Sequence, residues 1–75
     1  MGTRQPRVTA GEMIKVIERL GFELARSSGS HRIYKNRASI RVTVPFHAGK
    51  ILHPKIVKTI LDEIGLSIDE FAEML

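Results

Sequence analysis

Residues 22–45 read FELARSSGSHRIYKNRASIRVTVP, and the fold of the chain depends on this stretch. Three runs that mix apolar and polar residues, FELARS, HRIYK and SIRVTV, are separated by the turn sequences SSGS and NRA. Alternation with a period of two predicts strands, and short junctions rich in Gly, Ser and Asn predict tight turns. In the third run, Ile40, Val42 and Val44 are expected to face inward. The stretch therefore predicts a three-stranded antiparallel meander.

A helix is predicted before the strands. Residues 9–12 read TAGE, the pattern of a capping box. In such a box the hydroxyl of Thr9 accepts from the backbone N–H of Glu12, whose carboxylate accepts in return from the Thr9 backbone. Apolar residues then recur at helical spacing, and Gly21 supplies a stop. These signals predict a helix over residues 10–20.

Two more helices are predicted after the strands. In HPKIVKTILDEIG, Pro54 suits the first helical position and Gly65 ends the helix. The sequence SIDE at residues 67–70 is a second capping box, and it begins a short C-terminal helix. The apolar contacts of that last helix are expected to be Phe71, Met74 and Leu75.

The predicted order is α-β-β-β-α with a small added helix, which is an α+β sandwich. The helices are expected to pack on one face of the antiparallel sheet and to leave the other face open. Residues 1–8 are polar and contain a proline, and they predict a flexible N-terminal tail. Residues 9–75 are expected to form a single domain, because 75 residues are close to the minimum that folds alone.

Charge is distributed unevenly along the chain. The net charge is +4, but all twelve Lys and Arg residues lie at or before Lys58. Between Leu24 and Leu61 there are eight basic residues and no Asp or Glu. An unbalanced basic patch destabilises the compact state through self-repulsion, and so it favours a polyanionic partner. The commonest such partner is the phosphate backbone of a nucleic acid.

Composition excludes several other classes of protein. The chain has no cysteine, so it has neither disulfides nor a Cys-based zinc site. No apolar run reaches the roughly 18 residues of a membrane span, and the first residues lack the apolar centre of a signal peptide. Its three histidines, at spacings of 16 and 6 residues, match no common local zinc pattern. A cytoplasmic domain without a bound metal is the expectation.

Four segments together resemble one protein family. These are RLGFE, GSHRIYK, VTVPFHAGK and VKTILDEIGLSIDEF, which occur in this order between Arg19 and Phe71. With these separations the chain resembles the HicA (YcfA-like) toxins, small messenger-RNA interferases with a double-stranded-RNA-binding-domain-like fold. The resemblance implies an endoribonuclease that cleaves messenger RNA, with its catalytic histidine at His31. It also implies a HicB-type antitoxin partner that holds the toxin inactive.

Histidine is chemically suited to this reaction. RNA carries its own nucleophile, the 2′-hydroxyl beside each phosphate. Cleavage needs a base for that proton, an acid for the leaving 5′ oxygen, and positive charge against the developing phosphorane. Imidazole exchanges protons near neutral pH, and Lys and Arg supply the positive charge. No metal or other cofactor is required, and the basic half of the chain has no carboxylate cluster to hold magnesium.

His31 is the candidate general acid or base. His47, in PFHAGK, is a candidate second proton-transfer group or phosphate ligand, although a structural loop histidine fits equally. Because Ile33 and Tyr34 are adjacent and both apolar, the alternation leaves open which sheet face carries His31. Tyr34 fits the edge of the core better than a base-stacking role. The candidate RNA-binding residues are Gly29, Ser30, Arg32, Lys35, Lys50, Lys55 and Lys58.

Two other functions are compatible with the sequence. The first is a non-catalytic RNA-binding module that uses the same basic surface. The second is an interaction protein whose basic face binds an acidic protein. Removal of the His31 imidazole should abolish the activity of an enzyme but change little in a passive RNA-binding module. Salt-sensitive binding to RNA is expected of both, and not of a protein that binds only an acidic protein.

Overall fold

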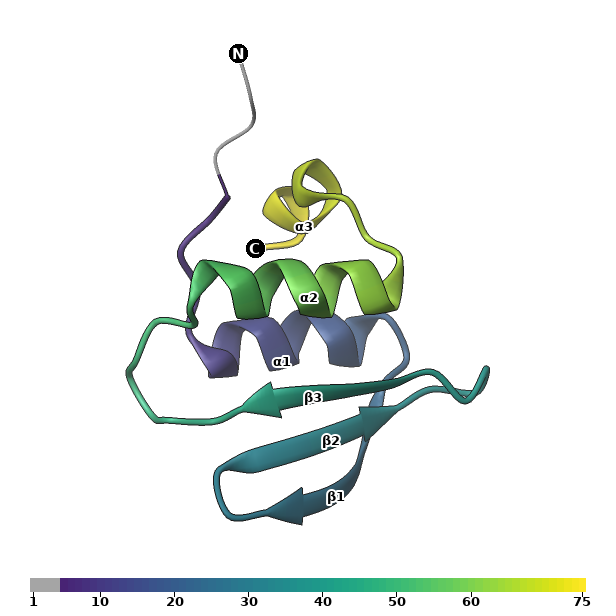
Figure 1. The fold of residues 1–75 in the computed structure, drawn as a ribbon. Coiled ribbons are helices and arrows are strands. Elements are labelled where there is room, and N and C mark those ends of the chain that lie inside the picture. The colour runs from purple at the N-terminus through teal and green to yellow at the C-terminus, as the bar shows by residue number, and fades with distance from the viewer. Residues whose placement is uncertain (1–4) are drawn as a thin grey trace.

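The computed structural model describes residues 5–75, which form three helices and one three-stranded sheet (Figure 1). The order α-β-β-β-α-α confirms the predicted α+β architecture and the double-stranded-RNA-binding-domain-like arrangement. In chain order the elements are α1 (Ala10–Arg19), β1 (Glu23–Ser28), β2 (His31–Lys35), β3 (Arg41–Pro45), α2 (Pro54–Ile64) and α3 (Ile68–Met74).

The sheet is an antiparallel meander in the order β1-β2-β3, as the turn signals predict. Between β2 and β3 the register is regular, with His31 opposite Pro45 and Lys35 opposite Arg41. Between β1 and β2 the register shifts between Leu24 and Arg26, which is a bulge. The sheet therefore has a regular half next to the helices and an irregular outer edge strand.

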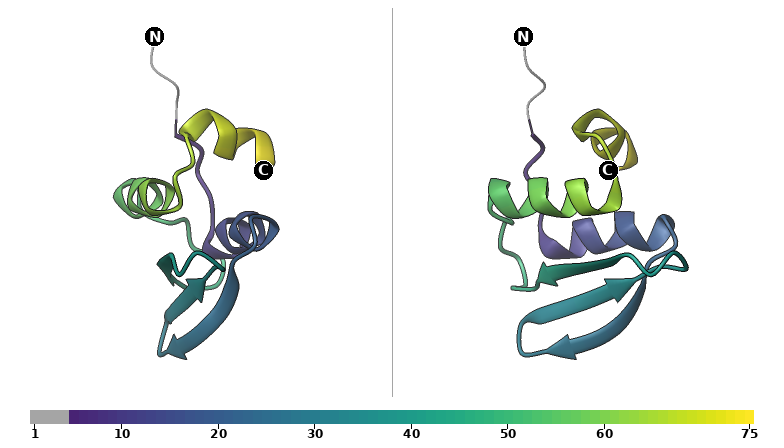
Figure 2. Two further views of the ribbon diagram at one scale, coloured as in Figure 1. Left: turned by 90° about the vertical axis from the view of Figure 1, so that its right-hand side faces the viewer. Right: turned by 45° about the vertical axis from the view of Figure 1, so that its right-hand side comes forward.

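The helices cover one side of the sheet beside β3. Figure 2 shows α1 and α2 next to one another, with the sheet on one side of them and α3 on the other. Both α1 and α2 contact β3. The core lies between these layers and is apolar throughout; its largest fully buried side chains are Phe71, Met13, Ile17, Ile60, Leu61, Val8, Val16, Val42, Val44 and Val57.

The helix ends follow the predicted capping signals. Thr9 and Glu12 form a capping box on α1, and Ser67 and Glu70 form a second one on α3. The backbone N–H and the hydroxyl of Ser67 hydrogen-bond the carboxylate of Glu70 and hold its pKa below the usual range. Pro54 is the first residue of α2, and Gly65 ends that helix with a left-handed φ of 74°.

Two sequence-based expectations about apolar side chains, those for Ile40 and Leu75, were wrong. Ile40 is 37 % exposed and lies before β3, because its N–H donates to the side-chain oxygen of Asn36 and so belongs to the turn. Leu24 is 52 % exposed, because β1 extends beyond the helices and has no buried residue. Leu75 is also 52 % exposed, since it follows the last residue of α3.

The segment before α1 reaches the core. Val8 is 1 % exposed, and its carbonyl accepts a hydrogen bond of 2.7 Å from the N–H of Leu52. The side-chain amide of Gln5 donates to the carbonyl of Pro54 at 2.8 Å. Within the predicted tail, residues 1–4 lie outside the described residues, and its flexibility stays a prediction. Of the helices in residues 5–75, none is long and apolar enough to span a membrane.

Candidate functional site

The strand register shows which face of the sheet carries His31. Directly opposed residues of antiparallel strands point to the same face, and successive residues alternate. Tyr34, opposite Val42, is only 2 % exposed, so these two residues define the face toward the helices. His31 lies at an odd number of residues from Tyr34 and is therefore on the other face. We call this the outer face; it carries His31, Ile33, Lys35, Arg41, Thr43 and Pro45, with Glu23, Arg26 and Ser28 from β1.

The outer face is mainly cationic. Lys35 and Arg41 are directly opposed across β2 and β3, and Arg26 lies opposite Ile33. All three basic side chains are exposed, and Glu23 is the acidic residue of this face. Because like charges on paired strands repel each other, this arrangement gains stability from a bound polyanion.

Arg32 lies on the opposite face from His31. It pairs with Val44, and its guanidinium stacks over the ring of Phe46 at 3.9 Å from the centroid. A cation–π contact of this kind holds the side chain against the sheet on the helix side. The structure therefore does not bring Arg32 together with His31 and Lys35.

A groove separates the outer face from α2, and we call it the α2 groove. The helix begins beside the end of β3 and runs back along that strand (Figure 1). The groove has a volume of about 370 Å³. His31 and Lys55 both line it, although they are far apart in the sequence. Its complete lining is His31, Thr43, Pro45, Lys55, Ile56, Thr59, Ile60 and Glu63.

A tight turn presents His31 to this groove. Gly29 and Ser30 are the two residues between the paired ends Ser28 and His31, and the φ of Gly29 is +57°. A positive φ at the first loop residue, followed by a negative one, fits a type II′ hairpin turn. The carbonyl of Ser30 accepts from the N–H of Phe46 at 2.6 Å. The backbone on both sides of His31 is thus fixed, while its imidazole is exposed.

We expect Gly29→Ala to destabilise the fold by roughly 1–2 kcal/mol, because an L-residue with a left-handed φ is strained. Free space surrounds the position, so the strain comes from the backbone and not from a clash. Gly11→Ala is the matched control: it lies in α1 with only an ordinary 3.8 Å contact, and alanine favours helix. Urea unfolding measures both variants. Equal stability of the two would contradict the strained turn.

His47 and Lys50 line a second hollow, of about 250 Å³, on the loop between β3 and α2. His53 lines it as well, and Pro45 and Ile56 line both this hollow and the α2 groove. The two hollows are therefore neighbours. The predicted second group, His47, is placed beside the α2 groove and not within its lining.

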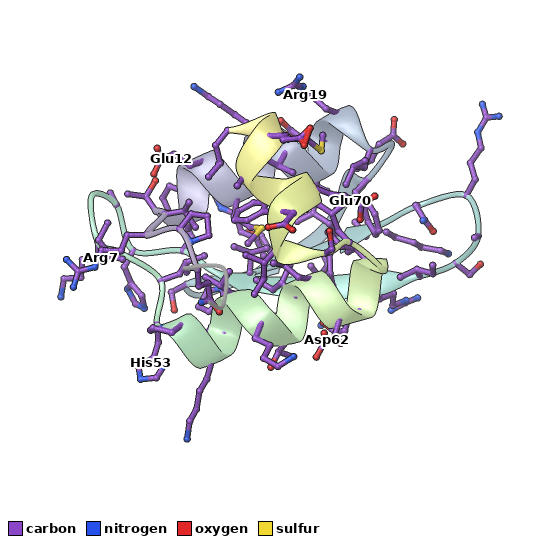
Figure 3. All side chains as sticks on the ribbon, turned by 90° about the horizontal axis from the view of Figure 1, so that it is seen from above. Arg7, Glu12, Arg19, His53, Asp62 and Glu70 are labelled. Atoms are coloured by element: carbon purple, nitrogen blue, oxygen red, sulfur yellow. The ribbon has the colours of Figure 1, made fainter. Side chains whose placement is uncertain are left out.

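His53 caps α2. Its Nδ1 accepts a hydrogen bond of 3.1 Å from the backbone N–H of Lys55, and Figure 3 shows His53 at the start of the helix, with Asp62 near the other end. An N-cap acceptor satisfies one of the unpaired donors at a helix start. The cap therefore helps to fix the backbone of Lys55, which lines the α2 groove.

We expect His53→Ala to lower the free energy of unfolding by about 1 kcal/mol, as for other N-cap residues changed to alanine. His53→Asn should restore that loss, because asparagine is a good N-cap acceptor. Chemical denaturation of both variants measures the difference. Equal destabilisation by alanine and asparagine would show that the hydrogen bond to Lys55 adds nothing to stability.

The two lysines of α2 have different surroundings. Lys55 lines the α2 groove, whereas the ammonium of Lys58 pairs with Asp62 at 3.3 Å and Lys58 is absent from that lining. Sequence reasoning overlooked Thr59 and Glu63. Thr59 and Glu63 follow Lys55 by four and eight residues, which places all three on one helix face and was a usable signal. In residues 5–75, no three His, Asp or Glu side chains form a cluster that could hold a metal ion.

Comparison with known proteins gives one family. A family model described as "HicA toxin of bacterial toxin-antitoxin" matches residues 10–66. The match begins at the first residue of α1, includes the whole sheet and α2, and stops before α3. Among curated proteins, no significant match is found.

Proposed function

Because the chain belongs to the family of HicA toxins of bacterial toxin–antitoxin systems, we propose that it is an endoribonuclease that cleaves messenger RNA with His31. Family membership makes it a toxin and implies an antitoxin partner. The ribonuclease activity, the role of His31, a HicB-type antitoxin and a cytoplasmic location are parts of the proposal.

The observation that carries the proposal is the position of His31. Its imidazole is exposed at one side of the α2 groove, which Lys55 also lines. The cationic side chains Arg26, Lys35 and Arg41 share its sheet face. This position supports the proposal, because imidazole exchanges protons near neutral pH and the nearby positive charge attracts an RNA backbone.

The proposed reaction is a transesterification within the RNA. The imidazole of His31 takes the proton of the 2′-hydroxyl, and the 2′ oxygen attacks the adjacent phosphorus. The bond from phosphorus to the 5′ oxygen then breaks, and that oxygen takes up a proton. The products are a 2′,3′-cyclic phosphate and a 5′-hydroxyl end. The ammonium of Lys55 stabilises the negative charge that develops on the phosphorane oxygens.

RNA binding extends beyond the reacting phosphate. We propose that Lys35, with Arg26 and Arg41, binds RNA phosphates along the outer face. At the hairpin turn between β1 and β2, the backbone of Gly29 and Ser30 approaches the RNA. The hollow lined by His47 and Lys50 adjoins the α2 groove, with which it shares Pro45 and Ile56. His47 is the proposed second proton donor or a phosphate ligand. Lys58, paired with Asp62, is proposed to have a weaker part in binding.

The proposal is tested with the purified chain and an end-labelled RNA in the presence of EDTA. We expect cleavage that persists in EDTA and fragments that end in a 2′,3′-cyclic phosphate. Expression of the chain alone should arrest growth, and coexpression of its antitoxin should relieve the arrest. Intact RNA after incubation with the folded protein would contradict the proposed activity.

A further inference from the structure

The α2 groove has an acidic end as well as a basic one. Lys55, Thr59 and Glu63 follow one another at intervals of four residues, so they form one stripe along α2. All three line the groove. At a rise of 1.5 Å per residue, Lys55 and Glu63 are separated by about 12 Å along the helix axis. The groove thus offers a cation beside His31 and a carboxylate farther along.

Glu63 is available to a ligand. Its side chain is exposed, and no described side chain forms an ion pair with it. The neighbouring Asp62, in contrast, pairs with Lys58. A carboxylate on an RNA-binding surface repels phosphate. The part of an RNA that fits this end of the groove is therefore a group that donates hydrogen bonds.

Among the RNA bases, guanine matches a carboxylate best. Its Watson–Crick edge carries two adjacent donors, N1–H and the N2 amino group, and a carboxylate has two oxygens that accept in parallel. Adenine and cytosine present one amino group next to a ring nitrogen that accepts, which repels the second oxygen. Uracil presents one N–H between two carbonyl groups. Unpaired bases in single strands expose this edge for recognition.

We propose that Glu63 is a specificity-determining residue that recognises the Watson–Crick edge of a guanine near the cleaved phosphate. This inference rests on the proposed function, because it assumes that His31 and Lys55 hold the reacting phosphate. The guanine then lies one or two nucleotides from that phosphate, toward the acidic end of the groove. Thr59, whose hydroxyl donates to the carbonyl of Lys55 at 2.9 Å, lies between the two ends.

The test uses RNA oligonucleotides that differ at one position within two nucleotides of the cleavage point. That position carries guanine, or hypoxanthine, which lacks only the N2 amino group. When the varied position is the one that Glu63 contacts, we expect kcat/KM of the wild-type protein to be roughly tenfold higher for the RNA with guanine than for the RNA with hypoxanthine. The reason is that a bidentate hydrogen-bonded pair contributes about 1–3 kcal/mol of discrimination. Glu63→Gln should reduce that preference to about twofold or less. The side chain of glutamine places its NH₂ group, a hydrogen-bond donor, opposite one of the two donors of guanine.

The matched control is Glu73→Gln, which makes the same change of charge on α3, on the far side of the helices from the sheet (Figure 1). It should keep the wild-type preference for guanine. A preference that survives Glu63→Gln, or a wild-type enzyme that cleaves all substrates equally, would overturn the inference alone. No cleavage at all by the wild-type protein would overturn the proposed function and this inference with it.

Discussion

His31→Ala is expected to reduce the rate of RNA cleavage by about a thousandfold, the range in which a positioned acid or base contributes. The fold should be unchanged, because the side chain of His31 is exposed and contributes nothing to the buried core. Affinity for RNA should change little, since one imidazole adds little to a surface that binds mainly through charge. Single-turnover cleavage and filter binding on the same RNA measure the two quantities.

Two other histidine variants make this result specific. His53→Asn keeps the N-cap of α2 and removes an imidazole, and it should cleave at nearly the wild-type rate. His47→Ala tests the proposed second proton-transfer group. A loss as large as that of His31→Ala would assign His47 to the reaction, and a loss of less than tenfold would assign it to RNA binding. Cleavage by His31→Ala at the wild-type rate would end the catalytic assignment.

The same variants separate the other functions. A passive RNA-binding module would bind RNA and never cut it, with or without His31. A protein that binds only an acidic protein partner would show no salt-sensitive binding to RNA. The proposed enzyme combines both properties: its RNA affinity falls steeply with salt because phosphate contacts release counterions, and its cleavage depends on His31.

Lys55→Ala is the second large effect and is expected to lower the cleavage rate by about a hundredfold. Lys55 lines the α2 groove with His31, where we propose that negative charge develops on the phosphorane, and loss of one such stabilising group typically costs this factor. The reduction should appear mainly in the rate at saturating RNA, because the charge on the phosphate oxygens grows in the transition state. Single-turnover kinetics over a range of protein concentrations separate the rate from the affinity.

Lys58→Ala is the matched control for this lysine. It removes the same charge from the same helix, but Lys58 pairs with Asp62 and does not line the groove. Its cleavage rate should stay within about threefold of wild type, with a small loss of affinity that disappears at high salt. Equal rate losses for the two lysines would mean that α2 contributes only general electrostatic attraction.

Much of the fold was predictable because its signals are local. The capping boxes at Thr9 and Ser67, Pro54 at the start of α2 and Gly65 at its end act within a few residues of the chain. The limits of β2 follow in the same way, since a glycine turn precedes His31. Such interactions depend on nearest neighbours, and so the order of the elements can be read from the sequence.

The candidate site was predictable only in part, because the site depends on contacts between distant segments. HRIYK has apolar residues at both Ile33 and Tyr34, so its pattern fits either face of the sheet. Tyr34 and Val42 pair with each other and are buried beneath the helices, which fixes the orientation of the strand. His31 and Lys35 therefore lie on the outer face, and Arg32 lies on the helix side.

Glu63 illustrates the same limit most clearly. It lies 32 residues after His31, and nothing in the local sequence connects the two. They line one groove because α2 packs against β3, and that packing is driven by burial of apolar side chains such as Val57 and Ile60. The amino-acid sequence was therefore sufficient to predict the order of the helices and strands, the basic centre of the chain and His31 as the candidate histidine. Which side chains share the groove was settled by the packing of the helix on the sheet, since burial of the apolar stripe orients every polar residue on the same helix.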